Sequence, residues 1–232
     1  MHKYKVLELF SGKQSFSKVA RTLGFETFTI DLANLPGQSL VKDINKLLIS
    51  DIPFYPDIIW ISFPCTTYSI MGLFKHRNGI KPKSVLAKQH DRLFLKVIHI
   101  LQYFPAAVFF IENPRGMLRK MPFMQCFDRT TVSYCQYGFK YQKPTDIWSN
   151  NLQSLFNPDG WKALQICTPG SSCHEPAPRG SSSGLRSINS YYEKCSIPSK
   201  LCSSILISCL TKFNKSEIKS LKQKEVPCYT QP

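Results

Sequence analysis

Apolar residues in the first part of the chain alternate between short continuous runs and stretches with helical spacing. The run Lys5–Leu9 is followed by apolar residues at positions 16, 19, 20 and 23, which are spaced as on one face of a helix. Two further apolar runs cover Glu26–Ile30 and Asp57–Ser62. The pattern predicts a strand, a tight turn and a helix, followed by two more strands.

A second helix and a fourth strand are predicted further along. Apolar residues recur at helical spacing through Ser84–Phe104, and Pro105 then ends the helix. Ala107–Ile111 is the next continuous apolar run. Continuous apolar strands that alternate with helices are typical of a parallel sheet covered on both faces. We therefore expect an α/β fold with a doubly wound, mostly parallel sheet, helices on both faces and a small irregular C-terminal appendage.

The character of the chain changes after Asn150. Thr168–Ser183 is rich in Gly, Pro and Ser and poor in apolar residues, which indicates a loop or linker. The apolar segment Pro198–Leu210 is predicted to be helical, and the lysine-rich tail Lys212–Pro232 is expected to be frayed. Three parts are expected, namely a core over 1–150, an irregular linker or reduced recognition region over 151–196, and a helix that returns to the core with a basic tail over 197–232.

Polar or conformationally special residues follow each predicted strand. They are Phe10-Ser11-Gly12, Asp31, Pro64-Cys65 and Glu112-Asn113-Pro114. The carboxyl ends of parallel strands meet at one edge of a sheet, and this edge is where open α/β sheets bind their ligands. The sequence therefore predicts the functional site at this edge.

Cys65 and Glu112 are the candidate chemical groups among these residues. A cysteine at a strand end can act as a nucleophile, although most cysteines are small buried thiols. A carboxyl directly after an apolar strand can be desolvated, which raises its pKa and lets it donate a proton; an ion pair with Arg115 is the structural alternative. Together they provide the nucleophile and the acid that are needed to add a thiol across an electron-poor ring.

Composition and charge narrow the class of protein. The chain has 232 residues, 43% hydrophobic and 19% charged, which excludes a disordered or fibrous protein. Lys and Arg number 30 against 15 Asp and Glu, for a net charge of +15, which favours a polyanionic partner such as a nucleic acid. No apolar stretch is long enough to cross a bilayer, so we expect no membrane partner.

The nine cysteines are scattered without a disulfide framework, and no signal peptide is recognised. We therefore expect a reduced intracellular protein, in the cytoplasm of a bacterial cell or of a virus- or phage-infected cell.

Four motifs, in order, resemble the cytosine-5 DNA methyltransferase family, particularly its short phage-like and virus-like members. Leu7–Gly12 resembles the first S-adenosylmethionine motif, Pro64-Cys65 the catalytic Pro-Cys, and Glu112-Asn113-Pro114 the Glu-Asn-Val motif. Residues 136–150 resemble the later block that contains a Lys-Pro-Thr strand. The resemblance covers residues 4–150 and implies a Rossmann-like methyltransferase core that binds S-adenosylmethionine.

The resemblance also implies a reaction, methylation of carbon 5 of a cytosine that is flipped out of double-stranded DNA. Cys65 would attack carbon 6 of the base while Glu112 holds or protonates the neighbouring ring nitrogen. The family's Gln-x-Arg-x-Arg pattern has neither arginine here. The cation near the base carbonyl oxygen must then be Lys140, Lys143 or a more distant residue.

The residues implied for the cofactor follow the first strands of the sheet. Gly12 permits a close backbone approach to the methionine moiety, Asp31 suits the ribose hydroxyls, and Asp43 matches the adenine-contacting position. Both aspartates could equally cap a turn or a helix. The full cofactor set is Phe10, Ser11, Gly12, Asp31, Asp43, Ile44 and Pro64.

Two alternative functions remain open. A relative of the same family acts on transfer RNA, so an RNA cytosine-5 methyltransferase is the alternative enzyme. The missing arginines, and the lack of room after Asn150 for the usual target-recognition domain, would also fit a catalytically inactive DNA-binding relative. The protein is expected to be a monomer.

Two further groups of residues have side chains that can bind a metal or phosphate. Cys167, Cys173 and His174 lie in the linker with Cys195 beyond, but their spacing matches no common zinc pattern, so the sequence predicts no metal site. A basic run after Cys65 could close over a flipped base and contact phosphate, or be only a solvated loop. Its residues are Lys75, His76, Arg77, Lys81 and Lys83.

Overall fold

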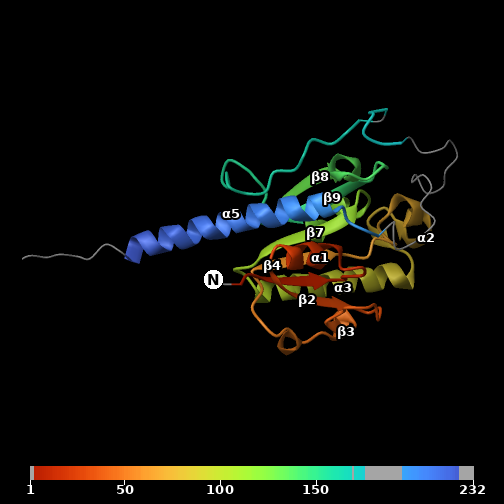
Figure 1. Cartoon of the computed structure of the whole chain (residues 1–232). Coiled ribbons are helices and arrows are strands. Elements are labelled where there is room, and N and C mark those ends of the chain that lie inside the picture. Colours follow the sequence, from red (N-terminus) through yellow and green to blue (C-terminus); the bar gives the residue numbers. More distant parts are fainter. Residues whose placement is uncertain (1–2, 169, 176–194, 225–232) are drawn as a thin grey trace, which may run out of the picture.

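A seven-stranded sheet forms the centre of the molecule (Figure 1). The computed structural model describes residues 3–168, 170–175 and 195–224, with side chains as far as Lys215. The strand order is β3-β2-β1-β4-β7-β9-β8. The strands are β1 Lys5–Leu9, β2 Glu26–Asp31, β3 Leu40–Val41, β4 Ile58–Ser62, β7 Val108–Pro114, β8 Arg129–Ser133 and β9 Pro144–Ser149, with a separate hairpin of β5 Arg77–Asn78 and β6 Lys81–Pro82.

Five strands of the sheet run parallel, from β3 through β2, β1 and β4 to β7. β9 pairs antiparallel with β7, and β8 pairs antiparallel with β9. The central strands β1 and β4 are almost completely buried, as their continuous apolar sequences require. The expected α/β fold with a mostly parallel, doubly wound sheet is confirmed.

Helices cover both faces of the sheet. They are α1 Ser15–Thr22, α2 Leu73–His76, α3 Val85–Tyr103 and α5 Ser199–Lys224, with the 3-10 turns η1 Ile44–Lys46, η2 Ile49–Asp51, η3 Ile70–Gly72, η4 Leu118–Lys120, η5 Pro122–Met124 and η6 Tyr134–Tyr137. α3 packs on one face, where Ile59 and Ile61 of β4 point. α1 and α5 pack on the other, where Trp60 stacks on Phe16. The alternation along β4 follows from the two-residue period of a strand.

The strand that carries Glu112 is longer than expected. The sequence predicts a strand that ends at Ile111, with Glu112 after it, whereas β7 continues to Pro114. The extension is stabilised by antiparallel pairing with β9, in which Glu112 lies opposite Ile147 and Asn113 opposite Asp146. Glu112 is therefore held by a strand and not by a loop.

The last helix corrects a prediction. The tail from Lys212 was expected to be frayed, but α5 continues to Lys224, and residues beyond it lie outside the described part. No glycine or proline interrupts the sequence before Pro227, and lysine is a good helix former. The Phe213 ring also packs on Tyr4 with 4.8 Å between centroids. The end of α5 projects beyond the sheet (Figure 1).

The described residues do not test the predicted linker or the predicted division of the chain. Most of the predicted linker Thr168–Ser183 lies outside them, and the division of the chain into three parts stays a prediction. Among the described helices, none has the length and apolar character needed to cross a membrane.

Candidate active site

A cavity of about 650 Å³ opens at the carboxyl ends of the parallel strands. It lies beside β1 and β4, between which the chain switches direction across the sheet, the usual ligand position in such folds. Its volume is typical of a small-molecule site. The candidate residues that line it are Phe10, Ser11, Gly12, Asp31, Asp43, Ile44, Pro64, Cys65, Glu112 and Lys143.

The turn between β1 and α1 has an unusual backbone. Phe10 and Gln14 adopt left-handed φ angles of 55° and 58°, and Gly12 adopts 46°. Such angles are unfavourable for residues other than glycine and persist only where surrounding contacts enforce them. Asp31 supplies one such contact, because its Oδ2 accepts a hydrogen bond from the Gly12 amide at 2.8 Å. Asp31 thus acts as a turn cap while it also lines the cavity.

Gln38 supports the same turn, and sequence reasoning missed it. Ser11 Oγ donates to Gln38 Oε1 at 2.7 Å, and Gln38 Nε2 donates to the Gly12 carbonyl at 2.9 Å. Gln38 lies in the loop before β3 and belongs to no motif, so nothing in the sequence marked it.

Asp43 and Ile44 form another part of the cavity wall. Asp43 is the N-cap of η1, and its Oδ1 accepts a hydrogen bond from the Asn45 amide at 2.9 Å. Ile44 is buried beside it. The capping alternative is therefore realised, and the placement at the cavity leaves Asp43 available for a cofactor contact as well.

Cys65 lies in the loop after β4, and its backbone is fixed by a turn. Its carbonyl accepts hydrogen bonds from the amides of Tyr68 at 2.9 Å and Ser69 at 2.8 Å. Burial, together with the nearby Glu112 charge, raises the pKa of the Cys65 thiol to about 11, although the Lys143 charge acts to lower it. Cys65 is therefore a protonated thiol at neutral pH in the protein alone. Because only the thiolate is strongly nucleophilic, Cys65 must lose this proton before it can attack.

Glu112 is buried and directed by one hydrogen bond. Only 6% of its surface is exposed, and this burial raises the pKa of its carboxyl above the usual value. Tyr134 donates to Glu112 Oε1 at 2.8 Å, which moderates the rise, as does the charge of Lys143. A carboxyl in this environment retains a proton more readily than an exposed one. Tyr134 was missed because a buried tyrosine in η6 carries no sequence signal of its own.

The two candidate lysines differ in their position relative to the cavity. Lys143 lines the cavity, and its Nζ lies 4.9 Å from the centre of the Tyr134 ring. Lys140 is exposed and does not line the cavity; its carbonyl accepts a hydrogen bond from the Glu175 amide at 2.8 Å. The structure thus brings Lys143, and not Lys140, to Cys65 and Glu112.

Asn113 connects the two strands that carry the chemical groups. It is fully buried, and its Nδ2 donates to the Phe63 carbonyl at 2.7 Å. Phe63 begins the loop of Pro64 and Cys65, so Asn113 fixes the position of that loop relative to β7.

The basic run after Cys65 divides into structural and exposed residues. Arg77 is buried, pairs with Asp91 at 2.5 Å and stacks on the Tyr68 ring at 4.2 Å. His76 is buried against Ser84, with Nδ1 2.8 Å from Oγ. The prediction that these two contact phosphate is wrong, because their side chains hold the segment together. The exposed members of the run are Lys75, Lys81 and Lys83.

Glu8 is a further buried acid at the cavity that sequence reasoning missed. It is 1% exposed, and burial raises its pKa to about 7. Its Oε2 accepts a hydrogen bond from the Ser17 amide at 2.9 Å, at the start of α1. Glu8 lies within the apolar run Lys5–Leu9 and not at its end, so the strand-end pattern does not indicate it.

Residues that precede α5 also reach the cavity. Cys195 and Ile197 line it, and the Ile197 amide donates to Ser15 Oγ at 3.3 Å. The segment before α5 therefore closes one side of the site, while α5 itself packs on α1.

Known proteins similar to this chain were identified at the level of family, sequence and fold. The family profile described as C-5 cytosine-specific DNA methylase matches residues 4–144. The Type II methyltransferase M.CviJI of Paramecium bursaria Chlorella virus IL3A is 27% identical over 119 residues, which cover 47% of this chain and 30% of that protein. The matched part thus spans less than a third of this relative.

Solved structures of similar fold include a mutant of DNMT2 from Spodoptera frugiperda, with a TM-score of 0.46 and 19% identity over 66% of this chain and 52% of that one. The methyltransferase EhMeth of Entamoeba histolytica gives a TM-score of 0.46 and 15% identity, over 64% of this chain and 53% of that one.

Proposed function

The chain belongs to the C-5 cytosine-specific DNA methylase family, and from this membership we propose that it is a DNA (cytosine-5-)-methyltransferase. S-Adenosylmethionine is the cofactor of this family and supplies the methyl group. One observation carries the proposal: a cysteine after β4 and a buried carboxyl of β7 line the same cavity, and the charge of Lys143 acts on both.

The cavity fits the cofactor in its residues as well as in its volume. A Cβ at Gly12 would meet no atom within 4 Å, so the turn leaves open space where the methionine moiety would approach. We propose that Ser11 and Gly12 would hold that moiety, that Asp31 would bind the ribose hydroxyls, and that Asp43 and Ile44 would contact the adenine. Asp31 can do so because each carboxylate oxygen accepts more than one hydrogen bond.

The chain's own residues account for the covalent steps. The Cys65 thiol loses its proton when the substrate is bound, and Sγ then forms a bond to carbon 6 of cytosine. Glu112 holds a proton at the adjacent ring nitrogen, which stabilises the negative charge that develops in the ring. Carbon 5 takes the methyl group. Its proton then passes to water, and the electron pair left behind re-forms the ring double bond and expels Cys65 as a thiolate.

Lys143 has an electrostatic part in this scheme. Its charge lowers the pKa of both Cys65 and Glu112, so it favours the thiolate that the attack requires. It also lines the cavity together with Cys65 and Glu112, so it can offer a positive charge to a base bound there. We therefore propose that Lys143, and not Lys140, is the cation beside the carbonyl oxygen of the base.

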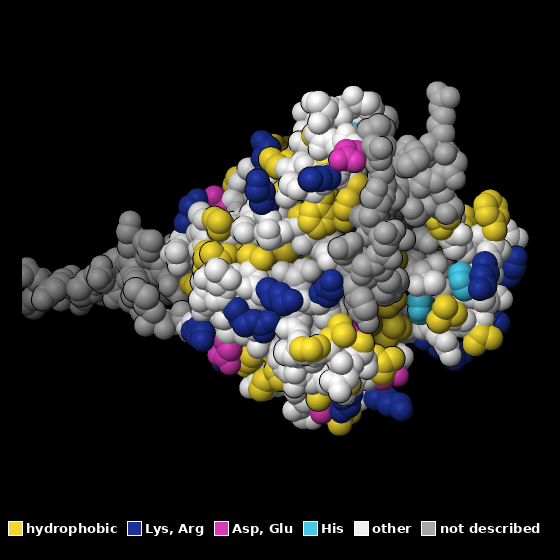
Figure 2. All heavy atoms as spheres, turned by 45° about the vertical axis from the view of Figure 1, so that its right-hand side comes forward, with side chains coloured by type: hydrophobic (Ala, Val, Ile, Leu, Met, Phe, Trp, Pro, Cys, Tyr) yellow, Lys and Arg dark blue, Asp and Glu magenta, His cyan; other side chains and the backbone are white. Residues whose placement is uncertain are grey.

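Double-stranded DNA is the proposed substrate, and the surface near the site supports it. The chain carries a net charge of +15, and Figure 2 shows Lys and Arg side chains across the visible face, mixed with hydrophobic ones at its right-hand side. Near α2, Met71 and Phe74 are exposed by 68% and 84% beside Lys75. Basic and apolar groups together suit phosphates and unstacked bases.

Free thiols support the proposed place of action. The cysteines of the described residues are all free, which is typical of proteins in the reducing interior of a cell. We propose that the enzyme works in a bacterial cell or in a virus- or phage-infected cell.

Covalent trapping tests the proposed function. The chain is incubated with S-adenosylmethionine and mixed-sequence DNA duplexes that contain 5-fluorocytosine, whose fluorine blocks the loss of the group at carbon 5. We expect a denaturation-resistant complex with the native chain and with Cys126→Ser, which alters an exposed cysteine, and none with Cys65→Ser.

The result that would overturn the proposal is the absence of a complex while S-adenosylmethionine still binds. A complex formed only with 5-fluorocytosine in RNA would move the activity to an RNA substrate. DNA binding without either complex would indicate a catalytically inactive relative.

A further inference from the structure

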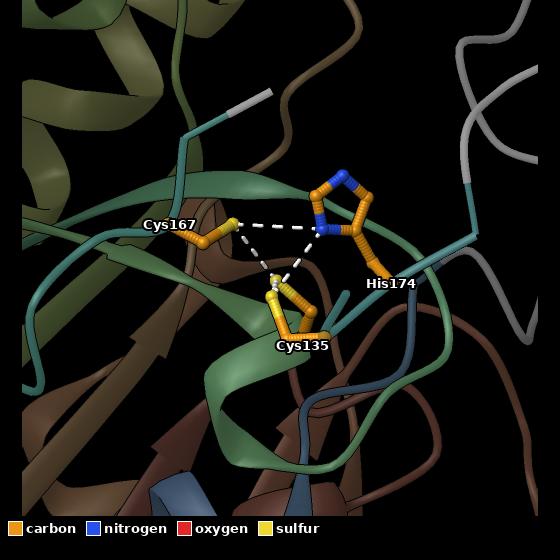
Figure 3. Close-up of side chains that lie close together, drawn as sticks. Cys135, Cys167 and His174 are labelled. Atoms are coloured by element: carbon orange, nitrogen blue, oxygen red, sulfur yellow. Dashed lines mark hydrogen bonds between the residues drawn. The ribbon is translucent and has the colours of Figure 1, made fainter. Parts of the chain in front are cut away.

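Three cysteines and a histidine meet at a point outside the cavity. Cys135 belongs to η6, while Cys167, Cys173 and His174 lie in the segment after β9. Their potential ligand atoms all lie within 4.8 Å of one another. Figure 3 shows the thiols of Cys135 and Cys167 and the ring of His174 turned toward one common point.

The distances within this cluster match a tetrahedral zinc site. Ligands at about 2.3 Å for sulfur and about 2.0 Å for nitrogen place tetrahedral S···S pairs about 3.8 Å apart and S···N pairs about 3.5 Å apart. The Sγ atoms of Cys135 and Cys173 are 3.8 Å apart. His174 Nδ1 lies 3.4 Å from Cys173 Sγ and 3.8 Å from Cys167 Sγ. The Cys135–Cys167 pair is closer, at 3.1 Å.

Neighbouring amides provide an independent indication. Gln142 Nε2 donates to Cys167 Sγ at 3.1 Å, and Gln136 Nε2 donates to Cys173 Sγ at 3.2 Å. N–H donors around metal-bound thiolates orient the ligands and stabilise their negative charge. The thiols are free, and 3.1 Å is well beyond a disulfide length of about 2.05 Å.

We propose that Cys135, Cys167, Cys173 and His174 bind one structural Zn²⁺ ion. Cys₃His is an established ligand set for structural zinc, and four protein ligands leave no open position for a catalytic water. Thiolates favour zinc over magnesium or calcium, which prefer oxygen ligands. The spacing of Cys167, Cys173 and His174 predicts no metal site, because it matches no common zinc pattern. The fourth ligand, Cys135, lies 32 residues before Cys167, outside any local motif.

The metal site would join the segment after β9 to η6, which carries Tyr134 next to the active site. Beside the cluster, the Glu175 amide donates to the Lys140 carbonyl at 2.8 Å, and the Leu164 amide donates to the Tyr137 hydroxyl at 2.9 Å. The ligand Cys135 is adjacent to Tyr134, which donates to Glu112. The metal would thus fix the residues that connect β8 to β9. Metal binding itself does not depend on the proposed function; only this consequence for Glu112 rests on it.

Metal content and cobalt substitution test the proposal on the full chain. We expect one zinc ion per chain after purification with reductant and zinc. After chelator treatment, added Co²⁺ should give the thiolate-to-cobalt charge-transfer band and the intense visible bands of tetrahedral cobalt. Cys167→Ser and Cys173→Ser should lose the metal, while Cys126→Ser, the matched control at an exposed cysteine outside the cluster, should retain it.

Two substitutions of His174 distinguish the loss of a metal ligand from misfolding of the chain. His174→Ala should lose zinc, and His174→Cys should recover it because Cys₄ is also a structural zinc set. The proposal is overturned if the native chain binds neither zinc nor cobalt. It is equally overturned if the ligand variants keep the metal, or if mass spectrometry shows a Cys135–Cys167 disulfide in its place. Because no readout involves methyl transfer, its failure is distinguishable from failure of the proposed function.

Discussion

The surroundings of single residues determine what the candidate groups can do. Glu112 combines burial with one hydrogen bond from Tyr134, so its carboxyl is both proton-retaining and oriented. Cys65 is partly buried near that carboxyl, which raises the pKa of its thiol. Both effects oppose premature ionisation in the protein alone and leave activation to the bound substrate. Glu8 shows the same effect of burial without a place in the proposed reaction.

Glu8→Gln should make the chain more stable at alkaline pH. Burial raises the pKa of Glu8 from 4.5 to about 7, so between these values the folded state keeps a proton that the unfolded state loses. The free energy of unfolding therefore falls as pH rises through this window and stays lowered above it, by an amount on the order of 3 kcal/mol.

Urea unfolding at pH 5 and pH 8 measures this effect. The variant should lose much of the decrease that the native chain shows between the two values. Glu26→Gln, at an exposed glutamate, is the control and should behave as the native chain. An unchanged pH dependence in Glu8→Gln would contradict the prediction.

At the scale of elements, the helices determine which strand ends meet at the cavity. α1 returns the chain from β1 to β2, and α5 packs on α1 over the same face of the sheet. The residues before α5 reach the cavity, so the last helix supports the site without carrying its chemistry. The interior face of α5 includes Leu201 and Ile205, which are fully buried.

A matched pair of substitutions within α5 tests this packing. Ile205→Ala should lower the free energy of unfolding by about 2–4 kcal/mol, because it removes buried methyl groups and leaves a cavity. Ile207→Ala, at a position with 53% exposure, should change it by less than about 1 kcal/mol. Equal effects in denaturant titrations would show that α5 does not pack on α1 in this way.

At the scale of the whole molecule, the net positive charge and the exposed lysines that follow Cys65 both favour a nucleic-acid partner. The excess of basic residues is large, and Lys75, Lys81 and Lys83 are exposed in the segment that follows Cys65. Long-range attraction would bring a nucleic acid to the surface, and we propose these three exposed lysines as its phosphate contacts.

Replacement of Lys75, Lys81 and Lys83 by Gln should weaken duplex binding and its dependence on salt. Each lost phosphate contact lowers the slope of log K against log salt by about 0.9, so the triple variant should lose roughly two to three units of slope. Fluorescence anisotropy over a salt series measures it. Lys18→Gln, an exposed change of the same kind on α1, should leave the slope nearly unchanged, and an unaltered slope in the triple variant would exclude this surface.

The sequence by itself determined the class of fold and located four of the five parallel strands, β1, β2, β4 and β7. Local periodicity and strand-end residues suffice for this, because buried parallel strands must be continuously apolar and their carboxyl ends must share an edge. The same reasoning identified Cys65 and Glu112, and the family resemblance added the cofactor residues; all of them line one cavity.

The tertiary structure decided what depends on contacts between distant segments. It extended β7 through Glu112 by pairing with β9, chose Lys143 over Lys140, and added Tyr134. It buried His76 and Arg77, and it joined Cys135 to the cluster around Cys167. Side chains brought together from separate segments leave no periodic trace in the sequence. Only the packing of the chain determines which lysine faces the acid and which cysteines share one point.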